Sequence, residues 1–511
     1  MLFPFPLNFI SDRILQAFSM PPLRNIQKPV LSGFTALYFF ISFSSFAQQS
    51  DSVFFRIADW LDRNAIGYTE LEKSTRLIGH RLTGTENGRK AEEQIFGVLK
   101  SAGIDSAAFE PFDFSAWQRK ASHLEIVPYR SDNFVDFESV SLANTASVSG
   151  LWHLVDAGDG LESDFRKLGE RIRDKCVLLN LGIKDSANEG KANLHRGEKV
   201  SLALQYGAKA LIFVHPGNKN QLLTGTASLK GEIVPVPALC ISGPDGKVVR
   251  SWMQKERLMA EMRVSNPVVN GSARNVLAYL PATRKTRETI VFTAHLDSWD
   301  LASGATDNGL GAFTLLDIAL ALKPYRHLFK RNLIFVWTMG EEQGLLGSKH
   351  LVKKWLDNKQ LDDVRLVINL DMVGNPAGFN AFSWPGMESA LQDFNQKVKI
   401  VMKDYPGKIS NAPGLHSDHQ PFLLHGIPSV SGISNLPDSI YDCYHANCDH
   451  ISLIRPQYLI SSAKIHSMLG FELSTAKKLP FRSFSEKKLI NWLKKTHLKE
   501  KLEISGEWRW N

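Results

Sequence analysis

Two patterns of apolar residues alternate along the chain from residue 275 onward. Short apolar runs, which predict buried strands, alternate with segments in which apolar residues recur every three or four positions, which predict helices. The clearest runs are TIVFTA (289–294), LIFVWT (333–338) and VRLVINL (364–370), and the clearest periodic segments are 311–323 and 348–359. Strands that alternate with helices predict an α/β fold built on a parallel sheet with crossover helices.

The pattern changes between residues 120 and 272. Short β-like runs dominate there, namely 175–181, 210–216 and 234–241, with a helical segment at 199–208 between the first two. Before this region, residues 88–103 repeat apolar positions with helical spacing, and Ile95, Val98 and Leu99 are expected to pack on the main sheet. We therefore expect four parts: a leader (1–47), the amino-terminal part of the main domain (48–119), an insert (120–272) and the rest of the main domain (273–511).

Length and composition agree with this division. The chain has 511 residues, more than one hydrophobic core normally serves, and its 43% hydrophobic and 22% charged residues are typical of globular proteins. The net charge of +8 is not accompanied by any nucleic-acid-binding motif, so we expect a solvated basic surface and no nucleic-acid partner.

Residues 24–48 have the form of a secretory signal. Arg24 and Lys28 precede an apolar stretch too short for a membrane span, and Ser45 and Ala47 fit a cleavage site before Gln48. We expect a periplasmic or secreted protein without a membrane-spanning segment after cleavage. The alternative is that this segment is not cleaved and anchors the protein in a membrane.

The carboxyl-terminal segment 485–504 is predicted to form one basic amphipathic helix. Such a helix either touches an anionic membrane surface or packs on its own domain, and we favour packing.

Histidine and carboxylate side chains follow the strand-like runs of the main domain. Ligands bind at the carboxyl ends of strands in α/β sheets, so these side chains are expected to converge on one site. Imidazole nitrogens with carboxylate oxygens suit zinc, and carboxylates can bridge two ions. The residues concerned are His295, Asp307, Glu341, Glu342, Asp371 and His445.

The motifs around these residues resemble those of the M28 family of zinc exopeptidases, and most closely its carboxypeptidase Q type. The resemblance rests on HLDSWD (295–300), the GATD loop (304–307) and the EEQG turn (341–344). It implies the zinc exopeptidase fold, with a mixed, mostly parallel sheet, helices on both faces and an inserted β-rich protease-associated domain at 120–272. It also implies two Zn²⁺ ions.

The resemblance further assigns a role to each residue. His295 and Asp371 would be terminal ligands of different metals, Asp307 the bridging carboxylate, and Glu342 and His445 the remaining ligands. Glu341 would be the general base. Adjacent side chains in extended chain point to opposite sides, so one glutamate can face a metal while the other faces the water.

Further residues have supporting roles by the same resemblance. Asp297 would hydrogen-bond a ligating imidazole and is not itself a ligand. Tyr444 would polarise the scissile carbonyl, and His416 and His419 would line the substrate pocket. The Asp307-Asn308 peptide would be cis.

The two cysteines that flank His445 leave two alternatives open. Cys443 and Cys448 either close a small disulfide loop or remain two buried thiols, and their spacing alone does not choose. We expect the bridge.

The function expected from the sequence is hydrolysis of terminal peptide bonds by a dizinc exopeptidase, either an aminopeptidase or a carboxypeptidase Q-like dipeptidase. Peptides or dipeptides are the expected substrates, and a homodimer is left open. Two rivals are a glutaminyl cyclase-like acyltransferase with one zinc and a receptor-like binding protein without catalysis.

Overall fold

The computed structural model describes residues 52–129 and 133–510 of the chain. The predicted signal peptide and leader at 1–47 lie outside the described residues. Two sheets organise the rest, and the chain passes from one sheet to the other at residues 117–121 and returns at residues 265–268.

The first sheet has four parallel strands at its centre. β12, β11, β13 and β16 pair in parallel, whereas β1 and β10 add antiparallel on one side and β14 adds antiparallel on the other. The sheet is therefore mixed and mostly parallel. Its strands in spatial order are β1 (Ala108–Trp117), β10 (Val268–Leu280), β12 (Asn332–Thr338), β11 (Thr289–His295), β13 (Val364–Asn369), β16 (Ser429–Ser434), β14 (Pro376–Asn380) and β15 (Lys408–Ser410).

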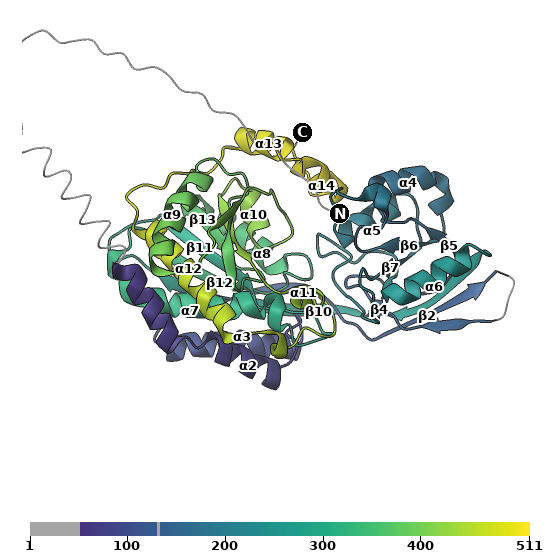
Figure 1. The fold of residues 1–511 in the computed structure, drawn as a ribbon, viewed down its shortest axis with the longest axis horizontal. Coiled ribbons are helices and arrows are strands. Elements are labelled where there is room, and N and C mark those ends of the chain that lie inside the picture. The colour runs from purple at the N-terminus through teal and green to yellow at the C-terminus, as the bar shows by residue number, and fades with distance from the viewer. Residues whose placement is uncertain (1–51, 130–132, 511) are drawn as a thin grey trace, which may run out of the picture. The chain divides into compact units, whose positions relative to one another are not determined.

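Helices cover both faces of this sheet because its central strands are apolar on both sides. Phe292 of β11 is buried in a core that includes α7 (Leu310–Leu322) and α12 (Pro456–Thr475), which pack against each other (Figure 1). Val291 points the other way, into a second core with α8 (Leu346–Asp357). Continuous apolar runs are typical of strands buried on two faces.

The second sheet is built from the insert. Its parallel strands β5, β6, β7 and β8 continue into antiparallel pairs at both sides. In spatial order its strands are β3 (Val135–Phe137), β2 (Ala121–Pro128), β9 (Leu258–Ser265), β5 (Val148–Asp156), β6 (Cys176–Asn180), β7 (Ala210–Val214), β8 (Ala238–Ile241) and β4 (Val140–Ser141). β10 runs through the expected boundary at residue 272 and belongs to the first sheet.

The remaining helices follow the expected segments closely. The helix predicted at 88–103 is α3, and those predicted at 199–208, 311–323 and 348–359 are α5, α7 and α8. The bounds are α2 (Gly67–Leu77), α3 (Glu86–Ser101), α4 (Glu162–Leu168), α5 (Arg196–Gln205), α6 (Gly243–Met253), α9 (Met387–Val401), α10 (His419–Leu423), α11 (Asp438–Tyr441), α13 (Glu486–Lys495) and α14 (Leu498–Ile504).

The prediction of one continuous helix at 485–504 is wrong. The segment forms two helices, α13 and α14, because His497 adopts a left-handed conformation with φ of 57° between them. Leu489, Trp492 and Leu493 are buried in the main core, and the Trp492 indole donates to the Ser383 carbonyl. The expected packing of this segment on its own domain is confirmed.

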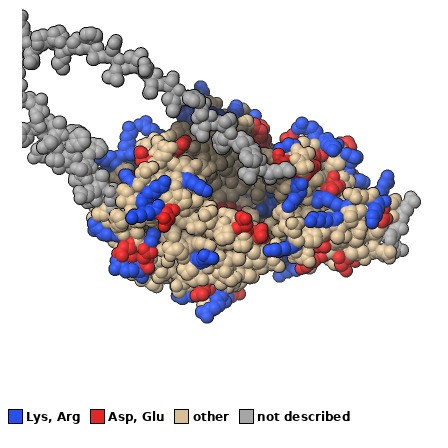
Figure 2. All heavy atoms as spheres, viewed as in Figure 1, with Lys and Arg blue, Asp and Glu red and all other residues tan. Residues whose placement is uncertain are grey.

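On the face shown in Figure 2, basic and acidic side chains are interspersed rather than gathered in one basic patch. Among the described residues, no helix is both long enough and apolar enough to span a membrane.

Candidate metal centre and active site

The carboxyl ends of three neighbouring strands supply most of the site. β11 ends at His295, β12 ends three residues before Glu341, and β13 ends two residues before Asp371. Because these strands are parallel and adjacent, their ends lie at the same edge of the sheet. The expected convergence of these residues is confirmed by the distances below.

One group of possible metal ligands forms around His295. Its Nε2 lies 3.3 Å from Asp307 Oδ1 and 3.5 Å from Asp371 Oδ1. These three atoms all lie within 4.8 Å of one another, close enough to bind one ion. Ser417 donates a hydrogen bond of 2.8 Å to the other oxygen of Asp371 and so orients that carboxylate.

A second group forms around His445. Its Nε2 lies 2.9 Å from Asp307 Oδ2 and 3.1 Å from Glu342 Oε2. The other oxygen of Glu342 is buried and has no hydrogen-bond partner. An unpartnered buried carboxylate oxygen is costly, and a bound cation would satisfy it.

Asp307 belongs to both groups, with one carboxylate oxygen in each. It lies in the turn Ala305–Gly309 that leads into α7, and the Asp307-Asn308 peptide is cis, as the resemblance implied. The carboxylate of Asp449 accepts hydrogen bonds from the backbone N–H groups of Thr306 and Asp307. The turn is therefore held in place from a distant part of the chain.

Asp297 lies next to the first group and contacts it differently from the expectation. Its backbone carbonyl is 3.1 Å from His295 Nδ1, whereas its carboxylate is 3.7 Å away, too far for a hydrogen bond. The carboxylate instead accepts hydrogen bonds from the backbone N–H groups of Glu341 and Glu342, each at 3.3 Å. Asp297 thus positions the paired glutamates.

The electrostatics of the two groups favour a cation. Burial, followed by repulsion from neighbouring carboxylates, holds the pKa of Glu341 well above its usual value and raises the pKa of Glu342 to about 7. Burial opposes ionisation of Asp307, yet hydrogen bonds from His295 and His445 bring its pKa below the usual range. The pKa values of both histidines are raised, despite burial, by the carboxylates around them. Divalent cations would relieve this crowding of negative charge, so the donor set fits metal ions.

A cavity of about 380 Å³ opens onto both groups. Glu341, Tyr444, His416 and His419 all line it, so the structure brings every site residue expected from the sequence to one cavity or its wall, apart from the buried Asp297. Tyr444 stacks on His445 with ring centroids 3.8 Å apart. Burial raises the pKa of the Tyr444 phenol far above its usual value, so its hydroxyl stays protonated and can donate.

The two pocket histidines have different surroundings. His419 stacks on Phe382, its Nε2 lies 3.3 Å from the Gly414 carbonyl, and burial lowers its pKa to about 4. His416 stacks on His195 of the insert. The first is therefore a neutral wall residue, and the second joins the insert to the main domain.

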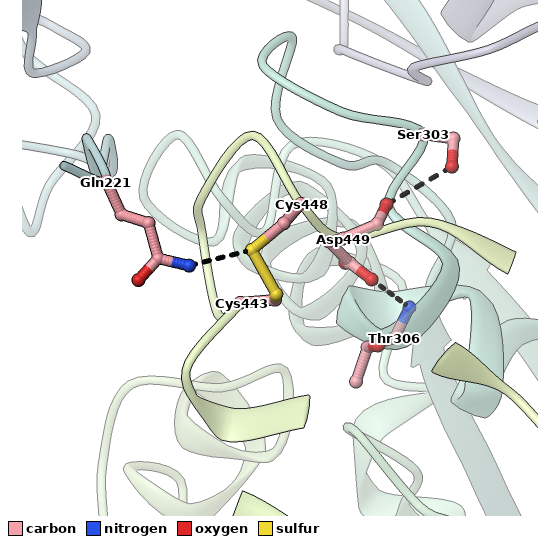
Figure 3. The surroundings of a disulfide bond; sticks show 6 residues. All are labelled: Gln221, Ser303, Thr306, Cys443, Cys448 and Asp449. Carbon is pink, nitrogen blue, oxygen red and sulfur yellow. Dashed lines mark hydrogen bonds between the residues drawn. A yellow bond between two sulfur atoms is a disulfide. The ribbon is translucent and has the colours of Figure 1, made fainter. Parts of the chain in front are cut away.

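A disulfide closes the loop that carries His445. Cys443 and Cys448 are bonded, so the expected bridge is confirmed (Figure 3). Gln221 of the insert donates to Cys448 Sγ at 3.2 Å, and Asp449 follows directly with its bond to Thr306. The loop that carries His445 is therefore closed by a disulfide and contacts both the insert and the loop before α7.

Several residues that support the backbone around the site were not identified from the sequence. Arg81 is buried and donates to the carbonyls of Leu296, Ser303 and Gly304, which fastens the loop between His295 and Asp307. The side chain of Asn308 bonds the carbonyls of His295 and Leu370. Arg81 lies in the segment IGHRLTG (78–84) and Asp449 in YHANCD (444–449), beside His445, and these positions were the available signal.

Comparison with known proteins identifies related peptidases. Residues 275–469 match the model of Peptidase family M28, and this range contains all six proposed ligand and base positions. This part of the chain is therefore similar to peptidase family M28. The curated relatives below are an aminopeptidase and a carboxypeptidase, and the chain is a hydrolase that acts on peptide bonds.

Two curated relatives match most of the length of this chain. Aminopeptidase YwaD of Bacillus subtilis (strain 168) is 26% identical over 429 residues, which covers 81% of this chain and 85% of the relative. Carboxypeptidase Q of Xenopus laevis is 22% identical over 426 residues, which covers 81% of this chain and 86% of the relative.

Solved structures share the fold of this chain. A peptidase M28 precursor from Shewanella amazonensis SB2B aligns with a TM-score of 0.72 at 20% identity and covers 86% of this chain and 99% of its own. The zinc aminopeptidase BSAP from Bacillus subtilis aligns with a TM-score of 0.60 at 23% identity and covers 82% of this chain and 97% of its own. The fold is therefore the mixed α/β fold of M28 peptidases.

Proposed function

We propose that this chain is a dizinc exopeptidase that hydrolyses terminal peptide bonds. The observation that carries the proposal is Asp307, whose two carboxylate oxygens lie in two different groups of ligand atoms. His295 and Asp371 would complete one zinc site, and Glu342 and His445 the other. Zinc bound there would lower the pKa of a water molecule and polarise the scissile carbonyl.

Glu341 is proposed as the general base. It lines the cavity beside both groups, and its backbone is held by Asp297. Its carboxylate would accept the proton of the attacking water and return it to the leaving amine.

Tyr444 is proposed to stabilise the transition state. Its protonated hydroxyl can donate to the carbonyl oxygen as negative charge develops there. The stacked ring of His445 limits the orientations that Tyr444 can adopt.

The insert is proposed to be a protease-associated domain that shapes the substrate cavity. The supporting observation is that His195, Arg196, Thr226 and Leu229, all from the insert, line the same cavity as the metal groups. It would determine substrate preference without performing chemistry.

Periplasmic or secreted location is part of the proposal. Its support is the signal-like leader together with the disulfide Cys443–Cys448, because disulfides persist in oxidising compartments. A homodimer stays a prediction from the resemblance.

Metal reconstitution tests the proposal. After chelation, activity on the tripeptide Leu-Ala-Phe should disappear and should return in proportion to added zinc up to two ions per chain. Products identify the end attacked: release of Leu indicates an aminopeptidase and release of Phe a carboxypeptidase. The proposal would be refuted by full activity with one zinc per chain, as in a glutaminyl cyclase. It would also be refuted if the zinc-loaded protein hydrolysed no peptide.

A further inference from the structure

The carboxylate of Glu507 contacts two side chains that hold different walls of the substrate cavity. One oxygen accepts a hydrogen bond of 3.1 Å from the side chain of Gln420, and the other lies 3.3 Å from Nζ of Lys349. The Glu507 side chain is only 11% exposed. Glu507 lies near the carboxyl end of the chain, outside the residues 275–469 that match the family model. A residue beyond the matched range therefore reaches toward the cavity.

The bond to Gln420 leads to the wall formed by the main domain. Gln420 is 1% exposed, and its side-chain oxygen accepts a hydrogen bond of 2.7 Å from the backbone N–H of His416. Both residues line the cavity. His416 has a φ of 69°, a left-handed conformation that is uncommon for residues other than glycine. Gln420, bonded to Glu507, therefore helps to keep the backbone of His416 in a conformation that it does not favour by itself.

The ion pair with Lys349 leads to the wall formed by the insert. Nζ of Lys349 also donates a hydrogen bond of 3.0 Å to the backbone carbonyl of Leu229, and Leu229 lines the cavity. Lys349 belongs to α8 of the main domain, so this bond joins the main domain to the insert. The position of Leu229 in the cavity wall therefore depends on the same carboxylate as the position of His416.

The segment that carries Glu507 is itself packed on both parts of the chain. Leu502 of α14 is buried in the main core, whereas Ile504 packs against a core of the insert. The backbone N–H of Glu507 donates to the Leu502 carbonyl at 2.7 Å, and the Ser505 hydroxyl donates to the carboxylate at 3.3 Å. Packing and hydrogen bonds of this kind hold a side chain in one geometry.

We propose that Glu507 is a positioning residue for peptide hydrolysis, which holds the His416 and Leu229 walls at the spacing that fits the substrate. The inference rests on the proposed function, because it takes the cavity as the place where the substrate binds. Glu507 is not one of the proposed ligands, and its effect passes through Gln420 and Lys349. Wall residues contact the substrate before and during the reaction, so their displacement raises KM and leaves kcat almost unchanged.

The first experiment measures kcat and KM for Leu-Ala-Phe with the zinc-loaded enzyme. Glu507→Ala should raise KM about tenfold, the range of one hydrogen bond, with kcat within about twofold of the wild type. Zinc content should not change. Glu507→Gln keeps an oxygen that can accept from Gln420 but loses the ion pair with Lys349, so its KM should be intermediate. The matched control is Glu503→Ala, which removes an ion pair with Lys499 within α14 and should keep the wild-type KM.

Hydrogen exchange tests the contact without relying on activity. The backbone N–H of His416 is bonded to Gln420, so exchange of the segment 414–420 should become about tenfold faster in Glu507→Ala. Glu507→Gln and Glu503→Ala should exchange there nearly as the wild type does. Residues 289–295, in the centre of the main sheet, should exchange alike in all four proteins, which separates a local effect from a general loss of stability.

A wild-type KM in Glu507→Ala would overturn the inference, and so would unchanged exchange of 414–420 in that variant. Loss of zinc or faster exchange of 289–295 in Glu507→Ala would also overturn it, because Glu507 would then support the fold as a whole. If the zinc-loaded wild type hydrolyses no peptide, the proposed function fails, and the exchange of 414–420 still decides whether Glu507 holds the cavity wall.

Discussion

The carboxylate of Asp297 accepts a hydrogen bond of 3.3 Å from the backbone N–H of Glu341, and its second oxygen accepts one from Glu342. The two glutamates follow β12, whereas Asp297 follows β11. One carboxylate thus links the ends of two parallel strands and sets where the proposed base and a proposed ligand stand.

Asp297→Asn tests this positioning. An amide has one accepting oxygen, so one of the two N–H groups should lose its partner, with a loss of about 1 to 3 kcal/mol in the free energy of unfolding. Turnover should fall at least tenfold, since Glu341 is no longer held. Denaturant unfolding and peptide kinetics measure both effects. Asp113→Asn, an exposed residue of β1, is the control and should change neither; unchanged turnover in Asp297→Asn would contradict the role.

The paired glutamates should respond differently to the same substitution. Glu341→Gln should lower turnover by about 10² to 10⁴ while both metals stay bound, because the amide keeps the shape but cannot accept a proton. Glu342→Gln should lower metal occupancy as well, because it removes a charged ligand candidate. Metal analysis and turnover on both variants decide this. Loss of zinc from the Glu341 variant alone would reverse the assignment.

Asp307 and Asp371 should differ in how many metals they hold. Asp307→Asn should reduce occupancy at both positions, because its two oxygens belong to both groups. Asp371→Asn should affect only the position beside His295, from which it is 3.5 Å. Stoichiometry by metal analysis after dialysis gives the answer. An Asp307 variant that loses one ion and keeps the other at full occupancy would show that the carboxylate does not bridge.

Removal of the disulfide should lower the zinc affinity of the site as well as the stability of the fold. Replacing Cys443 and Cys448 by alanine removes a short loop closure, for which about 2 kcal/mol is expected in the free energy of unfolding. His445 lies within the loop, so zinc affinity should fall as well. Thermal unfolding and zinc titration test this. The matched control is Cys176→Ala with Cys240→Ala, two buried thiols of the insert, which should leave zinc affinity unchanged.

His466 should make the protein less stable in mild acid. Burial lowers the pKa of His466 from 6.5 to about 4, although its bond to the Ser462 carbonyl opposes this. Between these pH values the unfolded chain binds the proton and the folded chain does not, so stability is complete above pH 6.5 and is lost as pH falls toward 4. The largest effect is about 3 kcal/mol.

His466→Gln should flatten this part of the pH profile of unfolding. The exposed His327, replaced in the same way, should leave the slope as in the wild type. A His466 variant with the wild-type slope between pH 4 and 6.5 would show that other groups cause the acid sensitivity.

The sequence by itself determined the strands, the main helices and which residues meet at the candidate site. Apolar runs such as 289–294 and 364–370 predict buried strands regardless of their neighbours, because a parallel sheet covered on two faces needs continuous apolar residues. The residues at the ends of those runs, His295 and Asp371 among them, were therefore expected to meet. The prediction of a continuous helix at 485–504 failed at His497, because amphipathic periodicity carries no information on a single left-handed residue.

Tertiary structure alone decided which atoms contact which. The family resemblance implied that the Asp297 carboxylate bonds the imidazole, yet this carboxylate accepts from the N–H groups of the glutamates, since the register between β11 and β12 brings those groups within reach. Likewise, Arg81, Asp449 and Arg196 come from segments far from β11, and long-range packing alone brings them to the site. Spacing along a chain predicts local structure, whereas hydrogen bonds between distant segments depend on how the whole chain packs.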